Sequence, residues 1–109
     1  VLGAAAMGDI GVHFPPSDDR WRDAASLGFL RHAGTLVREA GWTIVNVDAT
    51  VVAESPKIMR RSSEIRSAIA DALEIDPDRV SVKATTNERL GFVGRREGLA
   101  ATAVATLSR

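Results

Sequence analysis

The sequence predicts an α+β domain in which helices pack on one face of a mixed β-sheet. Apolar residues recur every three or four positions in some segments and alternate with polar residues in others. These segments follow one another as helix, strand, helix, strand, short glycine-bounded turn and strand, without a linker or an internal repeat. The 109 residues are therefore expected to form a single domain spanning residues 1–109.

The chain opens on the apolar run VLGAAAM, without an initiator methionine or a charged signal region. Such a run is typical of the end of a helix, so we expect the natural protein to extend N-terminally and this chain to be incomplete there. Residues 8–22 combine glycines, the pair Pro15-Pro16 and a charged cluster, and they are predicted to form a loop.

The first complete helix is predicted over residues 26–40, with Gly41 as its C-terminal stop. Its apolar face is formed by Leu27, Leu30, Gly34 and Val37. The side chains expected to point away from that face are Arg31, His32 and Arg38. A second helix is predicted to begin at a cap formed by Ser62 or Ser63 and to run through Leu73.

Alternation with a period of two residues predicts the clearest strand over residues 42–53. One face of this strand would carry Val45, Val47, Ala49, Val51 and Ala53, and the other Asn46, Asp48 and Thr50. Further strands are predicted over residues 79–85 and 97–107. The last is rich in alanine, so another backbone can approach it closely, either from a neighbouring subunit or from the chain's own helices.

The composition excludes several classes of protein. Lysine plus arginine and aspartate plus glutamate number 14 each, so the chain lacks the basic field of a nucleic-acid-binding protein. It has no cysteine for disulfides or thiolate metal sites, and no apolar run near the roughly 20 residues that span a membrane. We therefore expect neither a nucleic acid nor a membrane among its partners.

The segment 83–98 combines groups that suit a polyphosphate held with a divalent cation. Thr85 and Thr86 end a predicted strand, where hydroxyl and N–H groups can contact an oxyanion. Glu88 follows, and its carboxylate is a ligand suited to a hard cation that bridges phosphate oxygens. All three could instead be ordinary strand or turn residues, as could Lys83 and Arg95.

Other candidate groups are fewer. Asp9 lies between Gly8 and Gly11, where its carboxylate could accept two hydroxyls of a ribose or simply stabilise a turn. His13 and His32 do not form a pair at zinc-ligand spacing. The sequence also has no nucleophilic-serine elbow, Walker loop or dinucleotide fingerprint, so those chemistries are disfavoured.

Several short motifs occur in order along the chain: Gly8-Asp9-Ile10-Gly11, Phe14-Pro15, Asn46-Val47-Asp48, Ser55-Pro56-Lys57, Lys83-Ala84-Thr85-Thr86-Asn87-Glu88, Leu90-Gly91-Phe92 and Gly94-Arg95. Together they resemble the 2-C-methyl-D-erythritol 2,4-cyclodiphosphate synthase family, and the resemblance covers essentially the whole chain. Each motif alone is weak, whereas the ordered combination is specific.

The resemblance implies a lyase of the non-mevalonate isoprenoid pathway, built as a homotrimer with active sites between adjacent subunits. In that family the 2-phosphate of 4-diphosphocytidyl-2-C-methyl-D-erythritol 2-phosphate attacks the β-phosphorus, CMP leaves and a cyclic diphosphate remains. Two divalent metals, zinc and either magnesium or manganese, neutralise the phosphates, and no protein nucleophile is needed. The expected location is the cytoplasm, or the plastid stroma in a plant.

Site residues carry over from the family by position. Asp9, Ile10 and Gly11 would hold the ribose, while Phe14 to Asp18 would approach the methylerythritol group. The cytosine would be wrapped by residues 53–59, among them Ala53, Pro56, Lys57, Ile58 and Met59. Thr85 and Thr86 would contact the diphosphate, with Thr86 stabilising the transition state, and Glu88 would bind magnesium or manganese. The trimer cavity would be lined by Phe92 and Arg95.

The sequence departs from the family at several points. The family's zinc ligands, an Asp-x-His pair and a later histidine, belong to a segment that would precede Val1 and are not in this sequence. The His-Ser pair that contacts the substrate phosphate is also missing, so this stretch alone is expected to be inactive. The usual Gly-Arg-Gly-Glu-Gly reads Gly94-Arg95-Arg96-Glu97-Gly98.

The favoured hypothesis is therefore the synthase, alone or fused to or associated with the preceding cytidylyltransferase of the pathway. One alternative is a non-catalytic trimeric domain that binds a cytidine nucleotide, which calorimetry with CMP and CDP would reveal as binding without turnover. Another is an oligomerisation domain in which the segment 83–88 is only strand and turn. Such a protein would form trimers but bind no phosphate.

Overall fold

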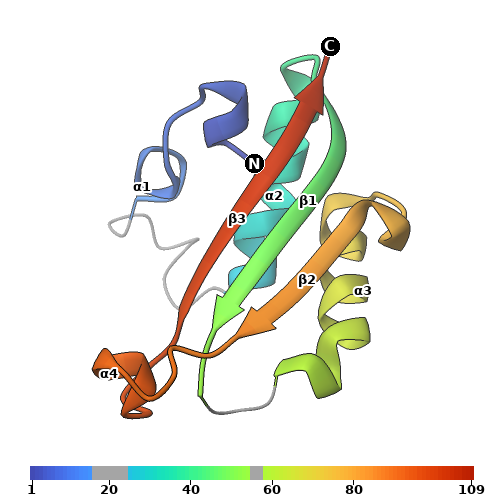
Figure 1. Cartoon of the computed structure of the whole chain (residues 1–109). Coiled ribbons are helices and arrows are strands. Elements are labelled where there is room, and N and C mark those ends of the chain that lie inside the picture. The colour runs from blue at the N-terminus through green and yellow to red at the C-terminus, as the bar shows by residue number, and fades with distance from the viewer. Residues whose placement is uncertain (16–24, 55–57) are drawn as a thin grey trace.

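The computed structural model describes residues 1–15, 25–54 and 58–109 (Figure 1). The elements in chain order are η1 (Gly3–Ala5), α1 (Ile10–His13), α2 (Ser26–Glu39), β1 (Thr43–Val52), η2 (Ile58–Arg61), α3 (Ser62–Leu73), η3 (Pro77–Arg79), β2 (Val80–Thr85), α4 (Gly91–Gly94) and β3 (Ala100–Ser108), where η marks a short 3-10 helix. The predicted succession of helices and strands is thereby confirmed.

The three strands form one mixed sheet with the order β2-β1-β3. β1 runs parallel to β2, with Val47 opposite Val80 and Val52 opposite Thr85. β3 pairs antiparallel on the other side of β1, with Val52 opposite Ala100. The carboxyl ends of β1 and β2 therefore lie at the same edge of the sheet, next to α4 (Figure 1).

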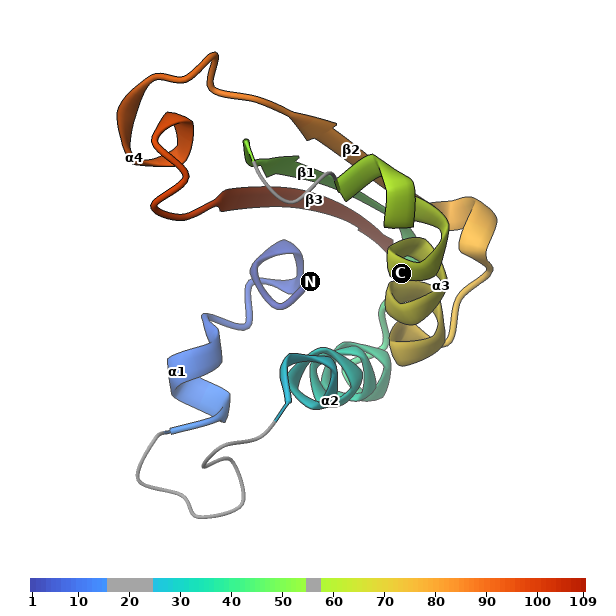
Figure 2. The same ribbon diagram turned by 90° about the horizontal axis from the view of Figure 1, so that it is seen from below.

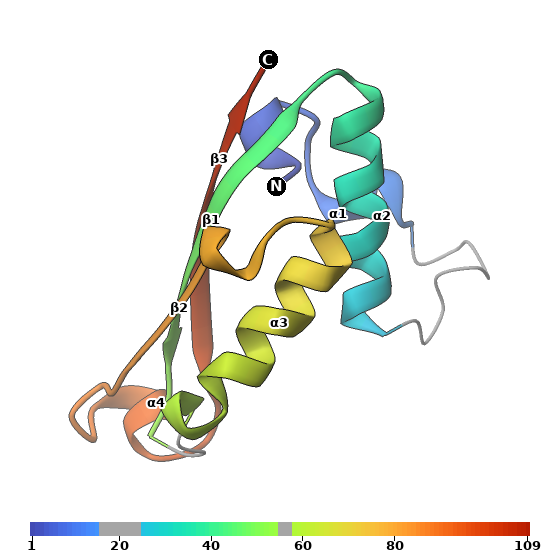
Figure 3. The ribbon, with the colours of Figure 1, turned by 90° about the vertical axis from the view of Figure 1, so that its right-hand side faces the viewer.

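α2 and α3 pack on one face of this sheet, as the sequence predicts (Figure 3). The view from below also places η1 on that side (Figure 2). The two helices approach closely at Gly34, where an added Cβ would lie 3.1 Å from Cδ2 of Leu73. A side chain at that position would press on the core, so glycine permits this helix pair.

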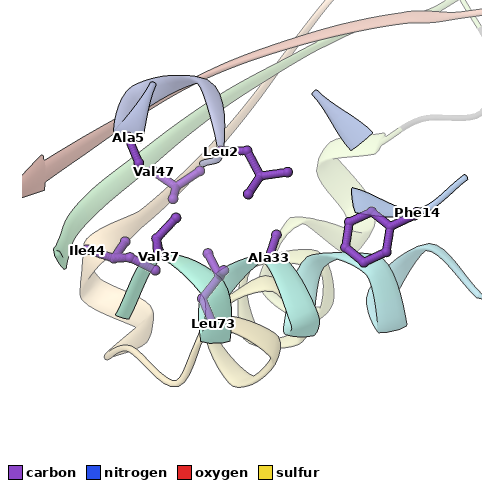
Figure 4. Close-up of a cluster of buried hydrophobic side chains, with 8 residues drawn as sticks. All are labelled: Leu2, Ala5, Phe14, Ala33, Val37, Ile44, Val47 and Leu73. Carbon is purple, nitrogen blue, oxygen red and sulfur yellow. The ribbon is translucent and has the colours of Figure 1, made fainter. Parts of the chain in front are cut away.

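The main core lies between the helices and the sheet (Figure 4). Its buried side chains are Leu2, Ala5, Phe14, Ala33, Val37, Ile44, Val47 and Leu73. Leu73 and Val37 are fully buried, and they bring α3 and α2 together. A smaller cluster of Ala70, Val80 and Val82 joins α3 to β2.

A β-bulge changes the predicted faces of β1. Its register with β3 shifts between Ile44 and Asn46, so Val45 has no opposite residue. Ile44 is consequently buried at 3% exposure, whereas Val45 is 37% exposed. The prediction that Val45 shares a face with Val47 is wrong, because one extra residue reverses the alternation on one side of the bulge.

Successive residues of β3 alternate between the two faces of the sheet, so that Ala101, Ala103 and Ala105 share one face. Ala103 and Ala105 line a cavity of about 200 Å³ together with Leu30, Ile69 and Leu73 from the helices. Ala103 and Ala105 therefore face the chain's own helices, with Ala105 half-buried and Ala103 still exposed. Val104 points to the other face and is 70% exposed.

Polar side chains of α2 make more contacts with other elements than predicted. His32 lies with its ring centroid 5.3 Å from that of Phe14, and Arg38 Nη1 donates to the Leu73 carbonyl at 2.7 Å. The prediction that His32 and Arg38 point away from the apolar face is wrong, because Phe14 and α3 flank the helix. Arg31 does lie at the surface, where it pairs with Asp71 at 3.4 Å.

Three predicted boundaries also differ. The opening helical tail is a single 3-10 turn, and residues 8–22 contain the one-turn helix α1. No serine caps α3, because η2 runs directly into it and Arg61 occupies the cap position. The third strand begins at Ala100 because Glu97 N–H donates to the Phe92 carbonyl at 2.9 Å and so still belongs to the preceding turn.

Candidate functional site at the carboxyl ends of β1 and β2

The parallel pairing of β1 and β2 brings together two chain segments that are distant in sequence. Thr85 ends β2 and Ala53 follows β1, and Ala53 N–H donates to the Thr85 carbonyl at 3.0 Å. Ala53 is buried at 8% exposure. This hydrogen bond therefore joins the start of the predicted cytosine segment to the predicted diphosphate residues.

Residues 86–90 form a loop that is held by its own polar groups, which we call the β2–α4 loop. Thr86 Oγ1 accepts from Glu88 N–H at 3.3 Å. Asn87 Nδ2 donates to the Leu90 carbonyl at 3.0 Å, and Leu90 N–H returns a bond to the Asn87 carbonyl at 2.9 Å. Thr85 Oγ1 contacts the Thr86 carbonyl at 3.4 Å. The loop therefore has a defined backbone in which Thr86 and Glu88 are neighbours.

The Glu88 carboxylate is exposed and makes no hydrogen bond or ion pair with the residues that the structure describes. Magnesium is commonly bound through one or two carboxylates, with substrate phosphates and water completing its ligands. A single free carboxylate beside two threonines thus fits this kind of site. Within the described ranges, no three His, Asp or Glu side chains are grouped closely enough to hold a metal by themselves, so they do not fit a complete zinc site.

Sequence reasoning missed one residue at this edge, Glu54. Its Oε1 accepts from the backbone N–H groups of Asn87 at 3.2 Å and Arg89 at 2.9 Å. The two bonds link Glu54, the second residue after β1, to the loop after β2. No local pattern in the sequence marked Glu54, because its role depends on the parallel pairing of β1 with β2.

Lys83 lies on the opposite face of the sheet from α2 and α3. Its Nζ is 3.0 Å from Asp48 Oδ2, across the pairing of β2 with β1. Both side chains are about half exposed. Lys83, a candidate phosphate ligand in the segment 83–98, is therefore already paired with Asp48.

α4 follows the β2–α4 loop and carries the residues predicted for the trimer cavity. Phe92 is 52% exposed, and its ring would lie 3.3 Å from a Cβ added at Gly98. Arg95 forms two bonds with the Glu97 carboxylate, at 3.0 and 3.1 Å. Arg96 has a φ of 62°, the left-handed conformation that favours glycine. The family's usual glycine at this position thus has a physical reason.

The residues predicted to hold ribose lie elsewhere in the chain. Asp9 caps α1, with its Oδ1 accepting from Val12 N–H at 3.2 Å. Ile10 is 64% exposed, and a Cβ added at Gly11 would lie 3.3 Å from Asp9 Oδ1. α1 and α4 are well separated (Figures 1 and 2). A single copy of this chain therefore does not bring the ribose residues to the β2–α4 loop.

Some of the remaining predicted residues are described by the structure, and the others are not. Phe14 is 5% exposed, and its ring packs on Phe29 with centroids 5.1 Å apart, so the structure places it in the core. Ile58 and Met59 begin η2. The predictions for Asp18, Pro56 and Lys57 lie outside the described residues.

A separate cavity of about 360 Å³ lies between the C-terminal ends of α2 and α3. Its lining includes Arg38, Trp42 and Glu74. None of the predicted site residues borders it. Among the described residues there is also no helix with the length and hydropathy needed to cross a membrane.

Known proteins resemble this chain in sequence and in fold. The 2-C-methyl-D-erythritol 2,4-cyclodiphosphate synthase of Xanthomonas axonopodis pv. citri is 56% identical over 109 residues, which cover 100% of this chain and 66% of that protein. The solved structure of the bifunctional IspDF from Campylobacter jejuni matches with a TM-score of 0.90 and 43% identity, over 97% of this chain and 29% of that one. The Plasmodium falciparum IspF structure, described as a CDP complex, matches with a TM-score of 0.81 and 36% identity, over 97% and 62%.

The chain thus spans about two-thirds of a single-function relative and less than a third of a bifunctional one. The profile of the YgbB family matches residues 1–108. Sequence and fold agree over nearly the whole chain, and this chain belongs to the YgbB family.

Proposed function

We propose that the natural protein is a 2-C-methyl-D-erythritol 2,4-cyclodiphosphate synthase and that this chain supplies the part that binds the diphosphate and one metal. The observation that carries the proposal is the free Glu88 carboxylate beside Thr86, held in a defined loop at the ends of two parallel strands. Membership of the YgbB family and the names of the relatives support this function over a non-catalytic one.

The proposed reaction needs positioning and charge neutralisation. The 2-phosphate oxygen attacks the β-phosphorus, the bond to the CMP oxygen breaks, and CMP leaves with the electron pair. A magnesium or manganese ion bound to Glu88 would neutralise charge on the diphosphate. Thr85 and Thr86 would orient the phosphates through hydroxyl and N–H groups, with Thr86 contacting the transition state.

We propose that each complete site lies between two subunits of a homotrimer. The separation of α1 from α4 supports this arrangement, because Asp9 and Gly11 can then hold the ribose from one subunit while Ala53 and residues 56–59 of another bind the cytosine (Figure 1). Ile10 and Asp18 would complete the substrate side of the first subunit, whereas the buried Phe14 would support this segment from the core. Phe92 and Arg95 would line the cavity along the trimer axis.

In the proposed enzyme, residues outside this sequence would supply the zinc ligands. Fusion to, or association with, the cytidylyltransferase of the pathway is a further proposal. It is supported by relatives named as bifunctional, including one from Brucella suis that is 56% identical over 107 residues, 27% of its length. The proposed location is the cytoplasm.

The test is CMP release from 4-diphosphocytidyl-2-C-methyl-D-erythritol 2-phosphate by the natural protein that contains this chain, with zinc and magnesium present. Glu88→Ala should reduce turnover at least about a hundredfold, in the range seen when one electrostatic group is removed from a reacting centre. Its circular dichroism and melting temperature should stay close to those of the unmodified protein, because the side chain is free and exposed.

Unchanged turnover in the Glu88→Ala variant would remove this residue from the site. Calorimetry with CMP and CDP tests the remaining alternative. Binding of either nucleotide without turnover, in a preparation loaded with both metals, would favour a nucleotide-binding protein over the synthase.

A further inference from the structure

The β2–α4 loop has a strained backbone at two adjacent residues. Glu88 and Arg89 are adjacent, and both adopt the left-handed conformation, with φ values of 52° and 64°. Residues with a Cβ rarely adopt this conformation, and two in succession are rarer still. The hydrogen bonds within the loop therefore need further support from contacts outside it, and the Glu88 carboxylate makes none with the residues that the structure describes.

Glu54 supplies that support from the end of β1. Its Oε1 lies 3.2 Å from Asn87 N and 2.9 Å from Arg89 N, on either side of Glu88. One carboxylate oxygen thus accepts both N–H groups that flank the candidate metal ligand. Hydrogen bonds to an ionised acceptor are stronger than those between neutral groups.

The backbone next to Glu54 is held in place by the sheet. The preceding residue, Ala53, is buried at 8% exposure and donates its N–H to the Thr85 carbonyl at 3.0 Å. The Glu54 side chain therefore starts from the ordered end of the sheet. Its reach to the loop sets the distance between the segment after β1 and the segment after β2.

We propose that Glu54 is a positioning residue, which holds the β2–α4 loop so that Glu88 and Thr86 face the metal and the diphosphate. The inference rests on the proposed function for the roles of those two residues. Glu54 would act only through the backbone of Asn87 and Arg89, as an acceptor of hydrogen bonds. A direct role as a second charged metal ligand is the competing explanation.

Three substitutions separate these explanations in the natural protein. Glu54→Gln keeps a carbonyl oxygen at the same reach but removes the charge, whereas Glu54→Asp keeps the charge but withdraws the oxygen by one methylene. Glu54→Ala removes both. Glu64→Ala is the matched control, because Glu64 is an exposed glutamate that pairs with Arg61 at 2.9 Å, away from the loop.

The first readout is amide hydrogen exchange at Asn87 and Arg89, measured without metal or substrate. Glu54→Ala and Glu54→Asp should raise these exchange rates about tenfold or more, the effect of losing one or two modest hydrogen bonds, while Glu54→Gln, which keeps the acceptor oxygen without its charge, should raise them less. The second readout is the affinity for Mn²⁺ in the presence of CDP, followed by the electron paramagnetic resonance of free Mn²⁺. It should weaken about tenfold in the same two variants and little in Glu54→Gln.

Unchanged amide exchange in Glu54→Ala and Glu54→Asp would overturn the proposal. The reverse order in Mn²⁺ affinity would also overturn it, with weak binding by Glu54→Gln and normal binding by Glu54→Asp. That order is expected if the Glu54 carboxylate binds the metal directly. Because amide exchange is measured on metal-free protein, it tests the positioning role of Glu54 whether or not the protein cyclises its proposed substrate. Failure of the proposed function would instead be seen as absent turnover in the unmodified protein.

Discussion

Gly94 packs directly against the backbone of Arg89, so that a Cβ atom added to the glycine would lie 2.6 Å from Arg89 Cα and 2.7 Å from its carbonyl oxygen. These distances are too short for non-bonded atoms, and the neighbour is backbone rather than a flexible side chain. α4 therefore packs on the β2–α4 loop at Arg89, the residue whose N–H also donates to Glu54. Both contacts hold the loop that carries Glu88.

Gly94→Ala should displace the loop and destabilise the protein. The added methyl group overpacks the contact with Arg89, which costs about 1–3 kcal/mol in the free energy of unfolding. Gly28→Ala is the control, because a Cβ at Gly28 in α2 has nothing within 4 Å. Its expected effect is a gain of about 0.5–1 kcal/mol from helix propensity. Chemical denaturation measures both, and equal behaviour of the two variants would contradict the close packing.

Arg96→Gly should stabilise the protein. Arg96 has a φ of 62°, and its side chain makes no ion pair among the described residues. Glycine adopts the left-handed conformation without strain, but it also loses more conformational entropy on folding than arginine does. The difference between these two effects is a gain of about 0.5–1 kcal/mol in the free energy of unfolding. Arg95→Gly should lower it instead, since Arg95 has a φ of −87° and pairs with Glu97. A loss of stability in Arg96→Gly would show that the arginine has a binding role of its own.

Arg38→Ala should separate α2 from α3 at their C-terminal ends. Its guanidinium donates to the Leu73 carbonyl at 2.7 Å, and removal of that charged donor should cost about 1–2 kcal/mol in the free energy of unfolding. Glu74→Ala removes only the exposed ion pair with Arg38 and should cost about 0–1 kcal/mol. Thermal melting of both variants gives the comparison. An equal loss in the two would assign the stabilisation to the ion pair rather than to the carbonyl bond.

Much of the fold follows from local patterns in the sequence. The alternation over residues 42–53 and the helical spacing over residues 26–40 predicted β1 and α2 to within two residues at each end. These patterns are strong because each element buries one face against the same core. The bulge at Val45 was not predictable, since it depends on the register with β3, which lies far along the chain.

The site was predictable in part for a similar reason. Thr85, Thr86 and Glu88 lie within four consecutive residues, and they belong to one of the ordered motifs. Glu54 was missed because its role depends on the parallel pairing of β1 with β2 and on a loop conformation that no local pattern indicates. The partners of His32 and Arg38 were missed for the same reason, because each reaches a residue from another element.

The most direct test of the proposed synthase is ³¹P nuclear magnetic resonance of 4-diphosphocytidyl-2-C-methyl-D-erythritol 2-phosphate with the natural protein, zinc and magnesium. The account predicts that CMP and a cyclic diphosphate form in equal amounts, with the 2-phosphate resonance lost because that group has become part of the ring. Hydrolysis would instead leave CMP and a product with separate phosphate monoester resonances. That outcome, or an unchanged spectrum with folded, metal-loaded protein, would contradict the account.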